Sequence, residues 1–408
     1  MSTVRVGIIG VGGRGSGFLH MFKRQPGAAI VGVADHNRER AERARANLSM
    51  QFDIYTSAEE LLARRDLDAV IVTTPDYLHK EHALAVLAAG KHLLVDKPIA
   101  TNVPDGLAIV EAARRSDRVL CMGFNLRYVP VLAEAKRLIA GGAVGRPFFS
   151  TALEYYDGGK TYMARWNRLK KYTGGLFLHK GSHDFDILNW FNYPARPERV
   201  SAFAGINVLK PEGLPFELEP GEKPGPNCAR CPVIHKCPDA THPSTEAKPL
   251  FDLETAKIDG YYKDLCIYYS DKDSYDNAVC IVEYDNGARA FHSEVFVTPI
   301  CNRFYTIVGD LGHMDIDLDQ RTIDLRPRWT QNHVRHTVQS GPGGHGGSDP
   351  GLVASFVRSI QRGERPRASA IDGVWSIAVG CAAELSRTEK RVVRIEELLD
   401  PKDPLLRE

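Results

Sequence analysis

Apolar and polar positions alternate over the first 125 residues in a pattern typical of a sheet covered by helices. Short β-branched apolar runs predict five strands, at 4–10, 28–35, 68–74, 91–96 and 119–124. The segments between them carry helix signals, such as Ser57 followed three residues later by Glu60. Strands that alternate with helices at this spacing predict an α/β domain over 1–125 with a doubly wound parallel sheet.

After residue 125 the pattern changes. Helices are predicted at 130–140, 174–191, 350–362 and 371–387, and a long strand at 147–156. Two hairpins are predicted, at 278–296, where Asp285-Asn286-Gly287 forms the turn, and at 303–318. Strands in succession predict that 126–408 is an α+β domain on an open, mostly antiparallel sheet. The stretch 208–262, rich in Pro, charge and Cys, is predicted to be an insertion.

The amino-acid composition limits the kinds of partner that the protein is expected to bind. The 408 residues are 43% hydrophobic and 25% charged, with a formal net charge of +1. A charge this small gives no global field that attracts nucleic acid or an anionic membrane. No apolar run approaches the roughly 18 residues of a membrane span, and the N-terminus opens directly on a strand pattern. We therefore expect a cytoplasmic protein that binds neither nucleic acid nor membranes.

The most specific motif is Gly10-Val11-Gly12-Gly13-Arg14-Gly15, between the first strand and its helix, with Asp35 ending the second strand. This is the context of a Rossmann dinucleotide site, since Gly10 permits the turn, Gly12 admits the pyrophosphate and Gly15 lets helix and strand pack closely. Asp35 favours NAD over NADP because a carboxylate bonds ribose hydroxyls and repels a 2′-phosphate, although Arg38 nearby keeps NADP open. The alternative is a glycine-rich turn that binds no dinucleotide.

Two further loops are expected at the carboxyl ends of strands, over 73–79 and 96–98, where open α/β sheets bind ligands. Lys97, fixed by Pro98, would stabilise a developing alkoxide or move its proton, unless it is an ordinary solvated lysine. The nicotinamide is expected across the mouth of these loops and the glycine loop. The remaining cofactor positions expected there are Thr74, Pro75, His79, Asp96, Lys97 and Asn125.

Three stretches together carry a family resemblance: GVGGRG at 10–15, TTPDYLHKEHALAVLAAGKHLLVDKP at 73–98 and GGLFLHKGSHDFDILNW at 174–190. The chain resembles the Gfo/Idh/MocA family, named for glucose-fructose oxidoreductase and inositol dehydrogenase. The resemblance implies that Lys97 is the lysine of the family's E-K-P tripeptide, with Asp96 in place of the glutamate. It also implies that His183 is the proton-transferring histidine of a D-x-x-x-H motif.

The acid of that motif is replaced by His179, followed by Lys180. Residues 179 and 183 are one helical turn apart on the predicted helix, so both imidazoles are expected on one face. Such a pair suits an anionic or strongly hydrogen-bonding substrate. We expect His179 and His183 to act in catalysis and Lys180 to position the substrate, and the alternative for His183 is a core histidine.

A run of basic and aromatic residues precedes this helix, including Arg165, Trp166 and Arg168. Arginine recognises carboxylate, phosphate or sulfonate, and aromatic rings stack on sugars. We interpret the run as a substrate loop, with a solvated basic loop as the alternative. His345, in the glycine-rich segment 339–349, is expected to reach the substrate, unless that segment is only a loop in which Asp349 caps the next helix.

Cys228, Cys231 and Cys237 in the insertion have the C-x2-C start of a zinc site but supply only three thiols. Cys266 is the favoured fourth ligand, with His235 or His242 as alternatives. Such a zinc ion would be structural, holding together an insertion short of core residues. The alternative is three free thiols.

The resemblance implies hydride transfer between NAD and a secondary hydroxyl of a sugar, cyclitol or glycoside. A second hypothesis is an NAD-recycling glycoside hydrolase that works by transient oxidation, elimination, hydration and re-reduction, on a substrate that could be anionic. A third is an NAD-binding regulator. Because the family's open sheet usually mediates association, we expect a homodimer or homotetramer.

Overall fold

The computed structural model describes residues 2–242, 249–339 and 344–407, except the side chains of 344–346. Within these residues, six parallel strands form the first sheet, in the order β3-β2-β1-β4-β5-β6. The strands are β1 (Val4–Ile9), β2 (Ala28–Ala34), β3 (Asp53–Tyr55), β4 (Ala69–Val72), β5 (His92–Val95) and β6 (Leu120–Met122). The predicted doubly wound parallel sheet is confirmed, with the short β3 added.

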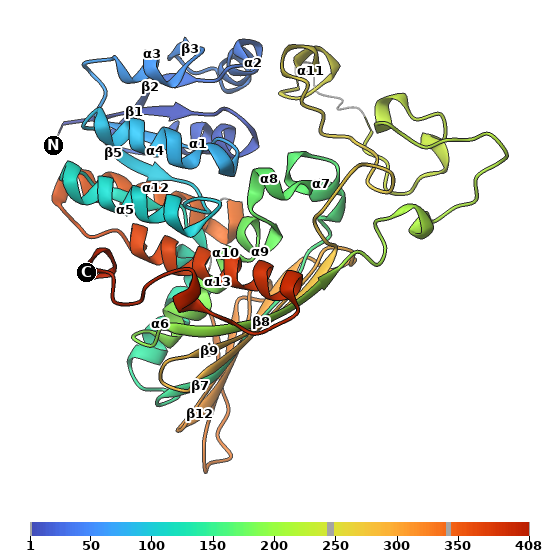
Figure 1. The fold of residues 1–408 in the computed structure, drawn as a ribbon. Coiled ribbons are helices and arrows are strands. Elements are labelled where there is room, and N and C mark those ends of the chain that lie inside the picture. Colours follow the sequence, from blue (N-terminus) through green and yellow to red (C-terminus); the bar gives the residue numbers. More distant parts are fainter. Residues whose placement is uncertain (1, 243–248, 340–343, 408) are drawn as a thin grey trace.

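Helices pack against this sheet and join its strands (Figure 1). They are α1 (Gly13–Phe22), α2 (Arg38–Leu48), α3 (Ala58–Leu62), α4 (His79–Ala88) and α5 (Val103–Ser116). Ser57 accepts the N–H of Glu60 at the start of α3, as the sequence predicts. One element from the far end of the chain joins them, because Leu352 and Phe356 of α12 (Gly344–Arg362) lie in the same apolar core as β1 and α1.

Within the described residues, nine strands form a second sheet, in the order β14-β13-β12-β11-β7-β10-β9-β8-β15. Every neighbouring pair is antiparallel except β7 and β10, so the predicted mostly antiparallel sheet is confirmed. The strands are β7 (Pro147–Tyr155), β8 (Pro197–Gly205), β9 (Asn277–Tyr284), β10 (Arg289–Val295), β11 (Asn302–Gly309), β12 (Gly312–Asp317), β13 (Thr322–Pro327), β14 (Val334–Thr337) and β15 (Val393–Arg394).

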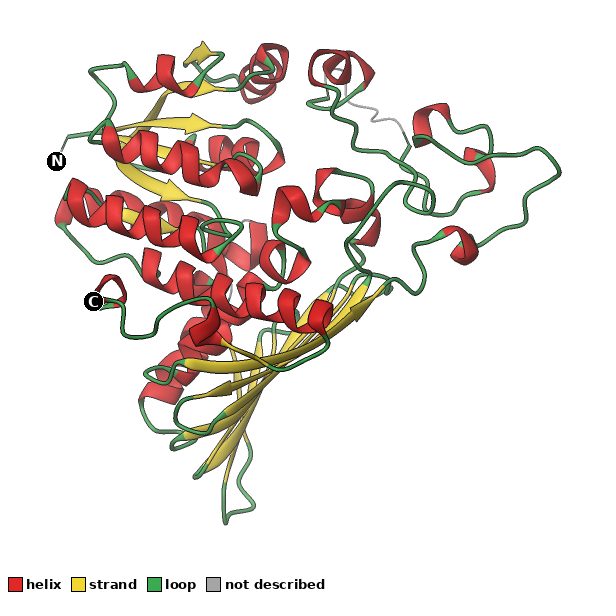
Figure 2. Cartoon of the chain, in the orientation of Figure 1, coloured by secondary structure: helices red, strands yellow, loops and turns green. Residues whose placement is uncertain are grey.

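Helices cover one face of this sheet and leave the other face open (Figure 2). The covering helices are α6 (Pro130–Ala140), α10 (Ser182–Asn192) and α13 (Ala370–Glu389). Side chains alternate accordingly, since Cys280 and Val282 of β9 are buried while Val279 and Ile281 are exposed. The helical side of the sheet therefore carries the core and faces the first domain.

The predicted single helix at 174–191 is wrong. The segment forms α9 (Leu176–His179) and most of α10, with a break at Lys180 and Gly181, and the short helix α8 (Lys170–Thr173) precedes it. A Cβ at Gly181 would lie 2.8 Å from the carbonyl oxygen of Phe177, so the chain packs at this break in a way that only glycine permits. His179 and His183 consequently lie on different helices, and their predicted common helix face is also wrong.

The prediction of a glycine-rich loop as far as residue 349 is wrong for its last residues, because α12 begins at Gly344. Asp349 therefore lies inside the helix and does not cap it. Its carboxylate instead accepts hydrogen bonds from Arg14 at 2.9 Å and from Asn125 at 2.8 Å. This tertiary use of Asp349 ties α12 to the first domain. Residues 340–343 lie outside the described residues, as does the side chain of His345.

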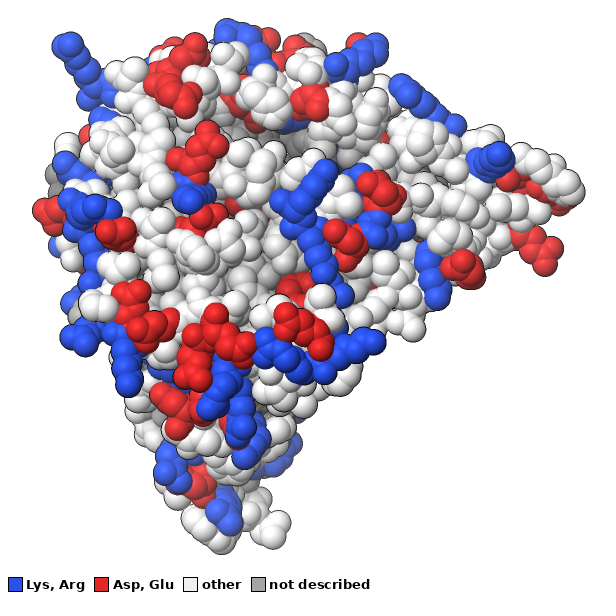
Figure 3. Space-filling model, viewed as in Figure 1, with Lys and Arg blue, Asp and Glu red and all other residues white. Residues whose placement is uncertain are grey.

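Where the structure describes it, at 208–242 and 249–262, the insertion contains short 3-10 turns and one helix, α11 (Leu253–Asp259). It extends away from the second sheet and returns so that α11 lies beside α2 (Figure 1). In the view of Figure 3, Lys and Arg alternate with Asp and Glu, so this face has no broad field of one sign. Among the described residues, no helix is long and apolar enough to cross a membrane.

Candidate active site and cofactor site

The glycine loop has the geometry of a dinucleotide cradle. A Cβ at Gly15 would lie 2.0 Å from the carbonyl oxygen of Gly10, and Gly10 itself has φ +89°. These two glycines are required for close packing of α1 on β1. A Cβ at Gly12 or Gly13, in contrast, would meet nothing within 4 Å. Open space therefore lies at the N-terminus of α1, where backbone N–H groups and the helix dipole favour a pyrophosphate.

Asp35 lies at the end of β2, as predicted, and is 6% exposed. Its carboxylate accepts hydrogen bonds from Val11 N at 2.7 Å, from Asn37 N at 2.9 Å and from Arg40 Nη1 at 3.2 Å. Arg38 turns away and bonds Glu42 at 3.0 Å on the surface of α2. The arginine beside Asp35 is thus Arg40, which the sequence does not single out.

At the other end of the loop, Arg14 joins three parts of the chain. It contacts Asp96 at 3.2 Å, after β5, and Asp349 at 2.9 Å, on α12. Asn125, in the 3-10 turn η2 (Asn125–Tyr128), donates to the same Asp349 carboxylate. Three of the predicted cofactor residues, Arg14, Asp96 and Asn125, are therefore brought together.

His79 is buried at the start of α4 and links the two predicted ligand loops. One ring nitrogen lies 2.6 Å from Pro98 O, and the other lies 3.0 Å from Thr74 O. The Thr74 hydroxyl in turn lies 3.2 Å from Nδ1 of His82. His79 thus holds the backbone on both sides of the site, so the loop carrying Lys97 is fixed against the loop carrying Pro75.

Lys97 and His179 meet directly. The Lys97 ammonium donates to the backbone carbonyl of His179. Burial lowers the pKa of Lys97, while Asp76 and Asp96 oppose that change. Lys97 is therefore a lysine whose proton is held less tightly than usual, which suits a group that exchanges a proton with a hydroxyl.

The ring of His179 is held from two sides. Its Nδ1 lies 2.6 Å from Asp76 Oδ2, and its Nε2 lies 2.8 Å from Asn167 Nδ2. Since the carboxylate only accepts and the amide nitrogen only donates, the imidazole is neutral with its proton on Nδ1. Burial lowers the pKa of His179, which favours the same neutral form, although Asp76 opposes it. The acid missing from the expected motif is thus supplied by Asp76, from the loop after β4.

Aromatic rings surround this histidine. The Trp166 ring centroid lies 5.3 Å from that of His179, at an interplanar angle of 79°. Tyr162 lies 5.6 Å away at 84°. Both are edge-to-face contacts, which hold the imidazole in one orientation. Trp166 was expected at the substrate, and it is placed beside the Lys97–His179 pair.

The basic residues of this loop differ in how far their charge is compensated. Lys180 lies 2.9 Å from Glu154 and 4.1 Å from the Tyr156 ring centroid, and both its side chain and Glu154 are largely buried. Arg168 bonds the backbone oxygen and the carboxylate of Asp271. Arg165 Nε, in contrast, is buried and has no hydrogen-bond partner among the residues that the structure describes. Arg165 therefore has a buried N–H with bonding capacity to spare.

His183 lies in the first turn of α10 and is half-buried, with its ring centroid 6.5 Å from that of Phe124. Four residues near the sites were not singled out from the sequence: Asp76, Asn167, Arg40 and Asp259. Asp76 alone had a local signal, since it follows Thr74-Pro75 at the carboxyl end of a strand. The other three are recognised only by contacts distant in sequence.

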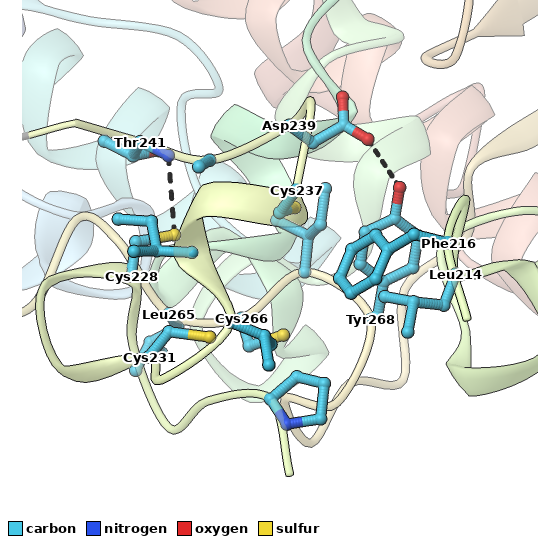
Figure 4. Close-up of a pocket in the computed structure, with 15 residues that line it drawn as sticks. Leu214, Phe216, Cys228, Cys231, Cys237, Asp239, Thr241, Leu265, Cys266 and Tyr268 are labelled. Atoms are coloured by element: carbon cyan, nitrogen blue, oxygen red, sulfur yellow. Dashed lines mark hydrogen bonds between the residues drawn. The ribbon is translucent and has the colours of Figure 1, made fainter. Parts of the chain in front are cut away.

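The four cysteines named from the sequence line one cavity in the insertion (Figure 4). Gly225 N donates to Cys231 Sγ and Thr241 N donates to Cys228 Sγ, both at 3.4 Å. Cys237 and Cys266 complete the lining, whereas His235 and His242 do not line it. In the described ranges, no three His, Cys, Asp or Glu side chains lie close enough together to hold a metal ion.

Comparisons with known proteins cover almost the whole chain. Residues 4–124 match the Gfo/Idh/MocA model described as the NAD-binding Rossmann fold of an oxidoreductase family. Residues 136–395 match the model of that family's C-terminal alpha/beta domain. The Bacillus subtilis protein YteT, named as an oxidoreductase, is 30% identical over 83% of this chain and 84% of its own length.

More distant relatives carry more specific names. A myo-inositol 2-dehydrogenase of Thermotoga maritima is 22% identical over 97% of this chain and 100% of its own. A 2,7-anhydro-N-acetylneuraminate hydratase of Mediterraneibacter gnavus is 28% identical over 50% of this chain and 53% of its own. The crystal structure of a levoglucosan dehydrogenase with NADH has a TM-score of 0.75 at 18% identity, covering 97% of this chain and 99% of its own. At that identity the structural likeness shows the fold alone.

Proposed function

Because the chain belongs to the Gfo/Idh/MocA oxidoreductase family, we propose that it transfers hydride between NAD and a secondary hydroxyl of a sugar, cyclitol or glycoside. The observation that carries the proposal is the half-buried Lys97 amine held against His179, whose ring is fixed by Asp76. Asp76 and Lys97 follow the carboxyl ends of β4 and β5, the edge where such sheets bind ligands. The relatives named as dehydrogenases of myo-inositol and levoglucosan support a polyol or sugar substrate.

The cofactor fits the residues present. The open space beside Gly12 and Gly13 accepts a pyrophosphate, and Asp35 stands where the adenosine ribose is bound in this fold. NAD, when bound, supplies the hydride acceptor. The chain itself contributes Arg14, Asp96 and Asn125, which fix the loops at the mouth of the site.

Lys97 is the proposed proton-exchanging group at the substrate hydroxyl. Its lowered pKa makes the neutral amine accessible, and the charged form stabilises an alkoxide. His183 is proposed to share this proton transfer. His179 is proposed to position Lys97. Asp76 fixes the His179 ring, and the backbone carbonyl of His179 accepts the hydrogen bond of the Lys97 ammonium. Trp166 and Arg165 are proposed to contact the substrate, and Lys180 is proposed to position it while paired with Glu154.

Substitution of Lys97 tests this assignment. Lys97→Met should abolish turnover of a substrate found by screening sugars, sugar acids and aryl glycosides with NAD, while NADH still binds. Lys80→Met is the matched control, because Lys80 is an exposed lysine paired with Asp105. Full turnover by Lys97→Met would remove Lys97 from the mechanism. Intact biological activity of both Lys97→Met and His183→Ala would favour an NAD-binding regulator.

The NAD-recycling glycoside hydrolase remains the second candidate, favoured by Arg165 and by the relative named as a hydratase. Oxidation at one carbon makes the neighbouring C–H acidic, elimination expels the aglycone, water adds, and the hydride returns from NADH. Arg165 suits an anionic group on such a substrate. Product formation without accumulation of NADH would support this reading, and NADH equal to product would exclude it.

We also propose that Cys228, Cys231, Cys237 and Cys266 hold a structural zinc ion. The N–H donors aimed at two of the sulfurs favour thiolates, the form that binds zinc, although burial raises the pKa of Cys228 and of Cys237. Elemental analysis should find about one zinc per chain, lost in Cys231→Ser and kept in Cys301→Ser, which alters an exposed cysteine outside the cavity. If the wild-type protein contains no metal, the four cysteines are free thiols and the zinc proposal is refuted.

Association through the open sheet face is proposed for the oligomer. Phe203, Val279 and Ile281 are 73%, 37% and 51% exposed, and Phe203 and Val279 are direct cross-strand neighbours. Exposed apolar residues gathered on one sheet face are typical of an interface between subunits. Whether the result is a homodimer or a homotetramer stays a prediction, as does the cytoplasmic location.

A further inference from the structure

A segment of the insertion folds back onto the first domain beside Asp35. Asn37 Nδ2 donates to Thr255 O and to Asp259 Oδ2, both at 3.0 Å. Arg43 reaches the same segment, at Pro249 O and at Asp252 Oδ2. The α11 segment is therefore docked on α2, next to the end of the strand that carries the predicted ribose-binding carboxylate (Figure 1).

Arg40 is shared between two carboxylates there. Its Nη1 lies 3.2 Å from Asp35 Oδ1, and its Nη2 contacts Asp259 Oδ2. All three side chains are 4–5% exposed. Burial raises the pKa of Asp259, but hydrogen bonds from Asn37 and Arg40 lower it more, so Asp259 is ionised at neutral pH. One guanidinium and two carboxylates leave a net charge of −1 at this place.

The two carboxylates lie beside the same exposed side chain, that of His36. His36 Nδ1 lies 3.7 Å from Asp35 Oδ1, while His36 Nε2 lies 3.5 Å from Asp259 Oδ2. The His36 side chain is 73% exposed, so the region that it bridges opens to solvent. In this fold the adenosine ribose lies beside the residue at the position of Asp35. A group on the 2′-oxygen of that ribose would therefore approach the cluster of Asp35, Arg40 and Asp259.

We propose that Asp259, contributed by the insertion, is a second determinant that makes the site select NAD over NADP. This inference rests on the proposed function and adds a residue that selects the cofactor. Asp259 acts in two ways: its charge repels a 2′-phosphate, and its bond to Arg40 occupies the cation that would otherwise bind that phosphate. Selection by a repulsive group placed against the competitor is a general means of specificity.

Asp259→Asn tests the proposal without disturbing the fold. Asn keeps the size and one acceptor for Asn37 or Arg40, while Arg40 keeps Asp35 as a partner. The probes are 5′-AMP and 2′,5′-ADP, which differ only in the 2′-phosphate and displace bound NADH. We expect the variant to bind 2′,5′-ADP about tenfold more tightly relative to 5′-AMP than the wild type does.

Two controls make the result specific. Asp259→Glu keeps the charge and should keep the wild-type ratio of the two affinities. Asp252→Asn loosens the same helix at its other end, where Asp252 pairs with Arg43, and should change both affinities alike. Thermal unfolding checks that each variant is folded.

An unchanged ratio of the two affinities in folded Asp259→Asn would overturn the role of Asp259 while leaving NAD binding intact. So would a change of that ratio in Asp252→Asn as large as the change in Asp259→Asn. A wild-type protein that binds neither NADH nor NADPH would overturn the proposed function and this inference together. A wild type that binds NADPH as tightly as NADH would overturn the selectivity alone.

Discussion

Replacing Asp76 by Asn tests what the negative charge of the carboxylate bonded to His179 contributes to the reaction. The carboxylate lies 2.6 Å from His179 Nδ1 and is 4% exposed. Asn keeps the size and an acceptor for the Nδ1 proton but carries no charge. A hydrogen bond to a charged group contributes about 1.5–3 kcal/mol, and a neutral one about 0.5–1.5 kcal/mol. The difference, about 1–1.5 kcal/mol, corresponds to about a tenfold loss of kcat/KM when it is felt in the transition state. Asp76→Ala, which removes the bond altogether, should cost about 10- to 150-fold.

The same substitution should move the pH profile. Burial lowers the pKa of Lys97, and Asp76 heads the charges that raise it again. Without the Asp76 charge, the pKa of Lys97 falls further, so the amine becomes neutral at lower pH. If the neutral amine accepts the hydroxyl proton, the acidic limb of kcat/KM moves to lower pH in Asp76→Asn.

The assay is kcat/KM against pH, in the direction of hydroxyl oxidation, with NADH affinity measured separately. Asp105→Asn is the matched control, because Asp105 is a half-buried carboxylate that pairs with Lys80, away from His179. An acidic limb displaced to higher pH, or an unchanged rate in Asp76→Asn, would refute the reasoning.

Three further predictions concern the loops and the open sheet. Gly13→Ala should keep the melting temperature and lose NADH binding, because its methyl group enters open space, whereas Gly15→Ala should lower the melting temperature, because its methyl group meets Gly10 O. Calorimetry and NADH titration separate the two. Arg165→Ala should raise KM with little loss of stability, whereas Arg168→Ala should lower stability by about 0.5–1 kcal/mol through its lost bonds to the exposed Asp271, as denaturant unfolding would report. Ile281→Lys should shift the oligomer toward monomers in light scattering, because it places a charge on the exposed apolar face, and an unchanged mass would exclude that face as the interface.

The sequence predicts what is local well. The order of strand, glycine loop and helix needs only neighbouring residues, and α6 has the predicted bounds. The break after α9 was missed because it depends on how closely Gly181 packs on Phe177, which helix periodicity does not report. Asp349 was misread as a cap for a similar reason, since its partner Arg14 lies 335 residues away.

The candidate site shows the same difference between features set by neighbouring residues and features set by contacts distant in sequence. Lys97 and His183 could be named from motifs, and His179 could be recognised as a departure. Asp76 and His179 are 103 residues apart, and Arg40 and Asp259 are 219 apart. No spacing rule connects such pairs, because the fold alone determines that they meet. The residues that tune the site are thus less predictable than those that define it.

The most direct test follows NADH and product together in one reaction. Wild-type protein, NAD and the sugar, sugar acid and aryl glycoside panel are incubated, with Lys97→Met in parallel. Hydride transfer to free cofactor predicts NADH equal to oxidised product in the wild type and neither in Lys97→Met. Product formed at the same rate after all NAD has been removed from the protein and the solution would contradict a role for hydride transfer.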